Sequence, residues 1–316
     1  MNTDLENMEP LVSVVVITYN QELFLPQTLD SILAQKVDFP IEIIIGEDCS
    51  TDNTKKVCVD YYNKYPQVIR LLLQEKNQGL LRNYNSVLNA CRGKYIAQCA
   101  GDDYWCDNDK LKIQVDFLEK NSDYGLVHGK FKQLNSRTGK IVKTKHFAPS
   151  GFVFKDLLEA GNHISAPTVM FRKDLLSKID IESFIDRGFI MEDYPMWIEF
   201  SRYCKFYFFD RYLACYRLLS ESVSHFKSYD KERFFLDNVF SIRDYYRDSS
   251  VDFELFEHNK KVDLLALSMK HNRRLEIKRL SYCLPESNFK QRVKKKLLLS
   301  GCTSIFNLMK FFKNIL

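Results

Sequence analysis

The stretch that decides the fold is Tyr95-Ile96-Ala97-Gln98-Cys99-Ala100-Gly101-Asp102-Asp103-Tyr104-Trp105. Its apolar first half predicts a buried strand, which ends in two adjacent carboxylates followed by two aromatic side chains. In an open α/β sheet, ligands bind at the carboxyl ends of the strands. Adjacent carboxylates at this edge repel each other and favour a divalent cation, which prefers oxygen ligands. The pattern therefore indicates a metal that holds a phosphate-bearing substrate; the alternative is a solvated Asp-Asp turn.

The composition is that of an ordinary globular protein. The chain has 316 residues, of which 45% are hydrophobic and 28% charged, which suffices for one large α/β domain and an appendage. Nine cysteines without a Cys-x-x-Cys pair predict reduced thiols and a cytoplasmic location. The short polar segment 1–10 does not resemble a signal peptide. The apolar run Leu11–Ile17 is far shorter than the roughly 18 residues of a spanning helix.

The net charge of +5 is unevenly distributed along the chain. Eleven basic and only two acidic residues lie from position 271 onward, so residues 1–270 carry a net negative charge. Within 290–316, three consecutive lysines precede an apolar stripe at helical spacing, formed by Ile305, Leu308, Met309, Phe312 and Leu316. This combination is typical of a helix on an anionic membrane surface; a helix packed on the main domain is the alternative. No recognised nucleic-acid-binding module accompanies the tail, so we expect no nucleic-acid partner.

Strands and helices alternate through the first 120 residues. Three apolar runs are typical of strands buried on both faces of a parallel sheet, namely Val12–Ile17, Ile41–Ile45 and Ile69–Leu73. Segments with apolar residues at helical spacing separate them, which predicts a doubly wound α/β sheet. Polar residues follow the strands at one edge, so Thr18, Asp48 and the pair Asp102–Asp103 are expected to converge in a nucleotide-binding crevice. Neither a Gly-rich dinucleotide loop nor a Walker A loop follows the first strand.

The pattern changes after about residue 122. Strands are expected over Gly125–Phe131, Lys140–Lys145 and Pro167–Arg172, with short helices over Lys155–Ala160 and within Asp186–Phe209. This half should continue the sheet in mixed orientation. From about residue 230 the chain is expected to be helical.

Seven motifs, in this order, resemble glycosyltransferase family 2, the inverting enzymes with the GT-A fold. They are Val12–Asn20, Glu42–Asp52, Asn77-Gln78-Gly79 with Arg82-Asn83, Gly93-Lys94-Tyr95-Ile96, Gly101–Trp105, Glu192-Asp193-Tyr194, and Tyr216-Arg217 before Ser222-Val223-Ser224-His225. The match covers roughly residues 10–226. The resemblance implies an N-terminal tail (1–10), a GT-A catalytic domain (11–229) with a nucleotide-binding half (11–122) and an acceptor half (123–229), and a helical basic region (230–316).

The resemblance implies that Thr18, Tyr19, Asn20 and Asp48 bind the nucleoside of a nucleotide-sugar donor. A carboxylate at Asp48 could accept a charge-assisted hydrogen bond from uracil N3–H, although thymine presents the same edge. A helix cap or turn residue is the alternative for Asp48. Arg82 is similar to the residue that contacts the diphosphate, and an ion pair with Glu75 is its alternative.

The resemblance also assigns the carboxylates. Asp103 would coordinate Mn²⁺ or Mg²⁺, Asp102 would contact ribose or a metal-bound water, and His225 is a further candidate ligand or a structural loop residue. Many relatives carry another acid at the position of Ala100, so no third carboxylate is expected there. Asp193 corresponds to the catalytic base, and Glu192 would assist it or bind the acceptor. Alternatively, both acids favour a helix N-terminus through its dipole.

These expectations converge on a metal-dependent inverting glycosyltransferase of hexosyl or N-acetylhexosaminyl type. It would transfer one sugar from a nucleotide-sugar, with UDP preferred, to a glycan or lipid-linked acceptor of a bacterial surface polysaccharide. Its expected location is the cytoplasm, at the inner face of the cytoplasmic membrane if the tail binds lipid. The rival interpretation is a non-catalytic protein that keeps the GT-A fold and binds nucleotide-sugars or glycans.

Overall fold

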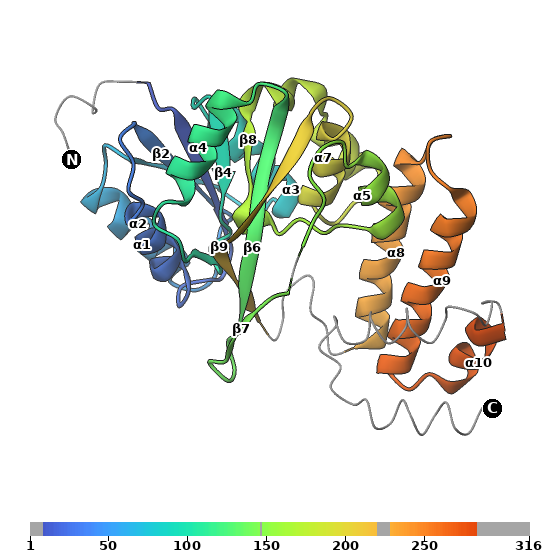
Figure 1. Ribbon diagram of the computed structural model, residues 1–316. Helices are drawn as coiled ribbons and strands as arrows, with labels where there is room; N and C mark the ends of the chain where they lie inside the picture. Colours follow the sequence, from blue (N-terminus) through green and yellow to red (C-terminus); the bar gives the residue numbers. More distant parts are fainter. Residues whose placement is uncertain (1–8, 146, 220–227, 283–316) are drawn as a thin grey trace. The chain divides into compact units, whose positions relative to one another are not determined.

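The computed structural model describes residues 9–145, 147–219 and 228–282. The chain divides into two compact units, Met1–Ser220 and Glu221–Leu316 (Figure 1). The strands of the first unit are β1 (Val12–Thr18), β2 (Ile41–Glu47), β3 (Ile69–Leu73), β4 (Tyr95–Gln98), β5 (Tyr104–Trp105), β6 (Tyr124–Asn135), β7 (Ile141–Lys143), β8 (Met170–Arg172) and β9 (Lys205–Leu218). Its α-helices are α1 (Leu25–Leu33), α2 (Thr54–Lys64), α3 (Leu80–Ala90), α4 (Lys110–Lys120), α5 (Phe154–Ala160), α6 (Ile181–Asp186) and α7 (Asp193–Phe200), and its 3₁₀ turns include η2 (Ala166–Thr168) and η3 (Lys173–Lys178).

The strands form one mixed sheet in the order β3-β2-β1-β4-β8-β6-β9-β5, with β7 paired to β6. β1 runs parallel to β2 and β4, and β2 runs parallel to β3. β8 is antiparallel to β4 and β6, whereas β6 and β9 are parallel to each other. The sequence-based prediction of an α/β sheet with a mixed second half is confirmed. The strand expected over Pro167–Arg172 begins only at Met170, because Pro167 lacks an amide hydrogen and lies in η2.

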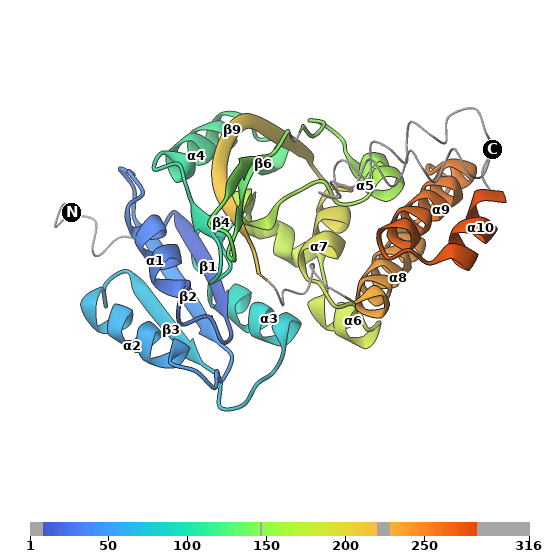
Figure 2. The same ribbon diagram turned by 90° about the horizontal axis from the view of Figure 1, so that it is seen from below.

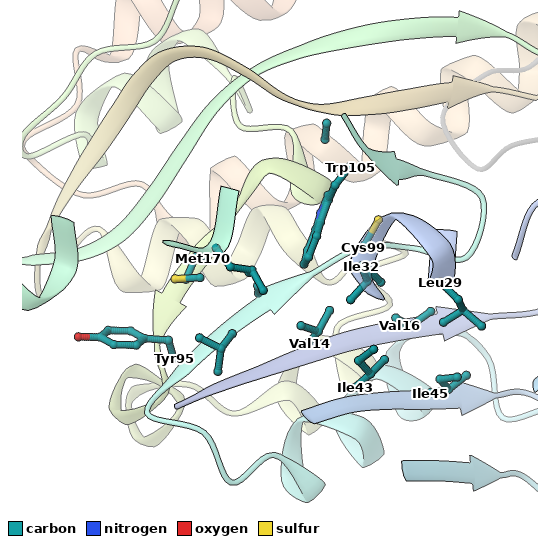
Figure 3. Packing of buried hydrophobic residues seen from close by; sticks show 14 of the residues in the cluster. Val14, Val16, Leu29, Ile32, Ile43, Ile45, Tyr95, Cys99, Trp105 and Met170 are labelled. Carbon is teal, nitrogen blue, oxygen red and sulfur yellow. The ribbon is translucent and has the colours of Figure 1, made fainter. Parts of the chain in front are cut away.

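Helices cover both faces of the parallel half of the sheet (Figure 2). The apolar residues Leu25, Leu29 and Ile32 of α1 pack with α2 and α4 on one face, against alternate residues of β1 and β2. Figure 3 shows Val14, Val16, Ile43 and Ile45 in this cluster. α3 contacts β1 and β2 through the residues that alternate with these. Burial of both faces explains why the central residues of β1 and β2 form nearly continuous apolar runs.

The second unit is helical and consists, over its described residues, of α8 (Tyr229–Tyr246), α9 (Phe253–Lys270) and α10 (Arg274–Tyr282). Val262 and Leu265 of α9 pack with Ile277 and Leu280 of α10. None of the helices in the described part of the chain is long and apolar enough to cross a membrane. Segments 1–8 and 283–316, which include the basic stretch 290–316, lie outside the described residues.

Candidate active site

The turn after β4 carries Asp102 and Asp103 and is fixed by hydrogen bonds to two neighbouring elements. Its amide N–H at Gly101 donates to the carbonyl of Ile17 in β1 (3.0 Å). The hydroxyl of Thr28 in α1 lies 2.6 Å from the carbonyl oxygen of Asp103 and 3.0 Å from that of Gly101. The turn is therefore held at the carboxyl end of β1, at the sheet edge where ligands bind in open α/β folds.

Gly101 permits this close approach because it lacks a side chain. A Cβ at this position would lie 2.5 Å from Oε1 of Gln21 and 2.7 Å from Oγ1 of Thr18. Real Cβ atoms do not tolerate such distances. The structure thus brings Thr18 next to the aspartate turn, as the strand order predicts.

Arg217, near the end of β9, makes two further hydrogen bonds to this turn. Its backbone N–H donates to Oδ1 of Asp103 (2.7 Å), and its Nε donates to the carbonyl oxygen of Asp102 (2.7 Å). The guanidinium also donates to Oε1 of Gln27 (2.5 Å) and lies 4.7 Å from the ring centroid of Phe24. The motif Tyr216-Arg217 does not reveal this role of Arg217, because its partners lie more than 110 residues earlier in the chain.

The two carboxylates of the turn are electrostatically strained. Burial raises the pKa of Asp102, and burial together with the neighbouring Asp102 raises the pKa of Asp103 well above its ordinary value. A divalent cation would relieve this repulsion, and oxygen ligands suit Mn²⁺ or Mg²⁺. The residues present therefore fit such a metal.

Further ligands would be needed to complete a metal site. Among the described residues, no group of three or more His, Cys, Asp and Glu side chains could hold a metal ion. Phosphate oxygens of a substrate and water are therefore required for the fit. His225, the further candidate ligand, lies outside the described residues.

Asp48 follows β2 and supports the neighbouring loop. Its backbone N–H donates to the carbonyl of Thr18 (3.1 Å). Its carboxylate accepts hydrogen bonds from the amides of Gln78 (2.7 Å) and Gly79 (2.9 Å), immediately before α3. Asp48 therefore joins the ends of β1 and β2 to the start of α3, and only 3% of the residue is exposed. These two hydrogen bonds correspond to the alternative of a helix cap, here at a helix that begins about 30 residues later in the chain.

Tyr19 and Asn20 extend the edge beyond β1. Tyr19 is 43% exposed. The side-chain oxygen of Asn20 accepts a hydrogen bond from the amide of Thr51 (2.8 Å), while the amide of Asn20 donates to Oγ of Ser50 (3.0 Å). Asn20 therefore ties the loops after β1 and β2 together, and its φ of 52° is one that Asn tolerates better than most residues.

Arg82 lies on the first turn of α3 and is half exposed. Its guanidinium is 3.6 Å from a carboxylate oxygen of Glu182 in α6. The ion pair that we considered as the alternative, with Glu75, is therefore replaced by one with a residue 100 positions later. A surface pair of this kind is weak, so Arg82 could exchange Glu182 for a diphosphate.

Glu192 and Asp193 form a second pair of adjacent carboxylates at the start of α7. The amide of Tyr194 donates to Oδ1 of Asp193 (2.6 Å). Burial raises the pKa of Asp193 to about 6, while burial and the Asp193 charge raise the pKa of Glu192 to about 8. Because the two adjacent carboxyl groups titrate together, the pair shares about one proton at neutral pH.

Asn162 is the side chain that orients Asp193. Its Nδ2 lies 3.3 Å from Oδ2 of Asp193, and its Oδ1 accepts a hydrogen bond from the amide of Ile164 (3.0 Å). Because the oxygen is engaged by Ile164, the amide group can only present its N–H₂ to Asp193. Sequence reasoning missed Asn162, since no local pattern connects it with a residue 31 positions later.

Tyr84 is hydrogen-bonded to the end of β4 and is affected electrostatically by the second carboxylate pair. Its buried hydroxyl donates to Oε1 of Gln98, the last residue of β4 (2.5 Å). Burial raises the pKa of Tyr84 well above its ordinary value, and the negative charge of Glu192 is the next largest cause. Glu192 therefore lies close enough to act on a residue bonded to the strand that leads to Asp102.

The family model described as "Glycosyl transferase family 2" matches residues 13–180, which is more than half of the chain. The chain belongs to glycosyl transferase family 2. The family prediction made from the motifs is thereby confirmed.

Two curated relatives of this family 2 chain illustrate the range of similarity. An uncharacterized protein of Mycobacterium tuberculosis is 36% identical over 165 residues, which cover 51% of this chain and 47% of the relative. The chain thus spans about half the length of that relative. The putative teichuronic acid biosynthesis glycosyltransferase TuaG of Bacillus subtilis is 29% identical over 219 residues, covering 69% of this chain and 83% of TuaG.

Solved structures support the GT-A fold. Residues 1–349 of Staphylococcus aureus TarS, in complex with UDP-GlcNAc, align with a TM-score of 0.51 and 18% identity over 84% of this chain and 82% of TarS 1–349. The mannosyltransferase PcManGT from Pyrobaculum calidifontis, in complex with GDP-Man and Mn²⁺, aligns with a TM-score of 0.53 and 17% identity over 77% of this chain and 66% of its own. The fold prediction is confirmed.

Proposed function

We propose that this family 2 chain is a divalent-metal-dependent, inverting glycosyltransferase. It transfers one hexosyl or N-acetylhexosaminyl unit from a UDP-sugar to a hydroxyl group of a glycan or lipid-linked acceptor in bacterial surface polysaccharide synthesis. The observation that carries the proposal is the pairing of two strained carboxylate sites. Asp102–Asp103 follow β4, and Glu192–Asp193 act on a tyrosine that is bonded to the end of β4.

On the donor side, Asp103 and Asp102 would hold Mn²⁺ or Mg²⁺, which would stabilise the charge developing on the departing nucleoside diphosphate. Arg217 positions both aspartates by donating hydrogen bonds to the backbone carbonyl of Asp102 and to the carboxylate of Asp103. In the nucleotide-binding half, residues 11–122, the nucleoside would contact Thr18, Tyr19, Asn20 and Asp48. Arg82 would contact the diphosphate.

Asp193 takes the proton from the attacking hydroxyl. Inversion needs one base on the face of the sugar opposite the leaving group. The raised pKa of Asp193, about 6, makes it ionised yet basic at neutral pH. The pair of Glu192 and Asp193 keeps about one proton at that pH, so Glu192 would assist Asp193 or bind the acceptor through this shared proton. Residues 123–229 form the acceptor half.

Similar proteins support the choice of a UDP-sugar donor, of a divalent metal and of a surface polysaccharide as acceptor. The TarS complex contains UDP-GlcNAc, and the PcManGT complex contains Mn²⁺. TuaG is named for teichuronic acid biosynthesis. A cytoplasmic location would give the chain access to nucleotide-sugars, and a peripheral membrane contact through 290–316 would bring it to a lipid-linked acceptor.

Calorimetric titration of UDP, GDP and dTDP, each with Mn²⁺ and with EDTA, tests the donor side. We expect metal-dependent binding of UDP. Binding of GDP alone would refute the proposal that Asp48 contacts a uracil base. If none of the three nucleotides binds, a non-catalytic protein is the better interpretation. Asp103→Ala should remove the metal-dependent part of UDP binding, whereas Asp193→Asn should stop turnover and leave UDP affinity unchanged.

A further inference from the structure

Four strands of the first unit form a ribbon, β5-β9-β6-β7, and one row of paired residues crosses it. Tyr104 pairs with Cys215, Cys215 pairs with Lys132, and Lys132 pairs with Lys143. Directly opposed residues present their side chains on the same face of a sheet. Since neighbouring strands lie about 4.8 Å apart, the row spans roughly 14 Å. It leads from Tyr104, the residue after Asp103, to two opposed lysines.

The row lies on the face of the ribbon that points away from the main core. Trp105, the next residue of β5, and its partner Ala214 both belong to the core cluster. Because side chains alternate along a strand, Tyr104 and its row occupy the opposite face. The ring of Tyr104 lies 5.7 Å from the guanidinium of Arg217, so this face continues into the aspartate turn.

The positive charge of the two lysines is not compensated within the ribbon. Like charges directly opposite each other destabilise an antiparallel pair. Seven basic residues and no acidic ones lie between Asp123 and Asp156. Over the described residues, Lys130 forms an ion pair with Asp210, but no ion pair is formed by Lys132 or Lys143.

An aromatic ring fixes one of these ammonium groups. Nζ of Lys143 lies 5.6 Å from the ring centroid of Tyr212, whose hydroxyl donates to the carbonyl of Thr144 (2.9 Å). A cation–π contact of this kind holds the ammonium without neutralising it. The strand pairing thus places two lysines opposite each other, neither of which forms an ion pair among the described residues, and functional sites often break such local rules.

Resting on the proposed function, we propose that Lys132 and Lys143 form an acceptor subsite for a phosphate group. Lysine binds phosphate as a point charge, and two ammonium groups match a diphosphate or phosphodiester. The row spans roughly 14 Å and ends at the residue next to the metal-binding carboxylates, so the donor sugar and the acceptor residue would lie between these carboxylates and the phosphate.

A phosphate group of the acceptor explains the ribbon better than a membrane surface does. The tip of the β6–β7 hairpin, Ser136-Arg137-Thr138-Gly139, has no apolar side chain to insert into lipid. Ile141 and Val142 are adjacent in β7 and therefore point to opposite faces. The ligand class is thus an acceptor that carries phosphate close to its reacting sugar.

The test is calorimetric titration with inorganic pyrophosphate in EDTA, which removes any metal-mediated binding at the donor site. We expect Lys132→Gln/Lys143→Gln to weaken binding at least tenfold, and Lys143→Glu to abolish it. The matched control, Lys55→Gln/Lys56→Gln, removes two exposed lysines of α2 and should leave binding unchanged. Equal affinities of the two double variants would overturn the proposal.

Thermal unfolding separates a ligand role from a structural one. Lys143→Glu replaces a like-charge pair by an opposite-charge pair, so Tm should rise by roughly 1–3 °C while phosphate binding is lost. A fall in both quantities would show that the lysines serve the fold and would overturn the subsite.

Further probes identify the source of the phosphate. Tighter binding of farnesyl diphosphate than of pyrophosphate would support a lipid-linked acceptor, and tighter binding of glycerol phosphate oligomers a phosphodiester glycan. If only vesicles of phosphatidylcholine and phosphatidylglycerol bind, and the double variant sediments less with them, a membrane surface replaces the subsite. UDP binding with Mn²⁺ should be unchanged in the double variant. If the wild type does not bind UDP, the proposed function is refuted, whereas the pyrophosphate titration still decides whether the two lysines bind phosphate.

Discussion

Replacement of Asn162 by alanine tests how the structure sets the reactivity of Asp193. The substitution removes the N–H₂ group that lies 3.3 Å from Oδ2 of Asp193 and leaves the amide of Tyr194 as donor to the other oxygen. A hydrogen bond to an ionised carboxylate favours its charged form. The pKa of Asp193, which burial raises to about 6, should therefore rise further in Asn162→Ala.

The size of the effect follows from the length of the hydrogen bond. Bonds to charged groups contribute about 1.5–3 kcal/mol, but at 3.3 Å this one lies at the weak end, so about 1 kcal/mol is reasonable. Since 1.36 kcal/mol corresponds to one pKa unit, the shift is about 0.7 units. A base must be deprotonated to act, so kcat/KM should fall about threefold at pH 6 and change little at pH 7.5.

The assay is the pH profile of kcat/KM for sugar transfer or donor hydrolysis, with Asn89→Ala on the exposed side of α3 as the control. We expect the acid limb of the Asn162→Ala profile to move to higher pH and that of the control to stay in place. A loss that is equal at every pH would mean that Asn162 only supports the loop, and an unchanged profile would refute its action on Asp193.

Three further substitutions test other parts of the structure. Glu42→Gln should destabilise the fold by about 2 kcal/mol in urea unfolding, because it weakens a buried network with Ser13 and Arg92. Burial alone would raise the pKa of Glu42, but these hydrogen bonds outweigh burial and lower the pKa. The contribution of Glu42 to the free energy of unfolding is therefore present above pH 4.5 and lost as the pH falls below that value. The same pH dependence of stability in the wild type and in Glu42→Gln would contradict this. Gly101→Ala should weaken UDP binding at least tenfold, since the new Cβ would displace Gln21 or the aspartate turn; an unchanged UDP affinity would count against the tight turn. Asp48→Asn should lower both UDP affinity and Tm, because it removes an acceptor for the amides of Gln78 and Gly79; loss of affinity with an unchanged Tm would show that Asp48 serves the nucleotide alone.

The first half of the fold is predictable from the sequence because local patterns determine it. The β-branched runs of β1 and β2 are buried on both faces, and the carboxyl ends of parallel strands lie at one edge. The positions of Thr18, Asp48 and the pair Asp102–Asp103 follow from that rule.

Contacts between distant segments were not predictable. Arg217 reaches Asp103 only because β9 pairs with both β5 and β6, whose residues lie about 80 to 110 positions earlier. The partner of Arg82 is Glu182, and no helical spacing relates the two. Asn162 and Asp193 meet because the loop after α5 returns to the start of α7. In each case pairing across the sheet or between loops selects the partner.

The central claim is that Asp193 drives inversion at a sugar held through the Asp102–Asp103 site. The most direct test is proton NMR, which can follow the hydrolysis of an α-linked donor such as UDP-GlcNAc in the presence of Mn²⁺, where water replaces the acceptor and takes the sugar from UDP. We expect the β-anomer of the released sugar to form first, EDTA to prevent its formation, and Asp193→Asn to abolish it. A first-formed α-anomer, or equal turnover by Asp193→Asn, would contradict the account.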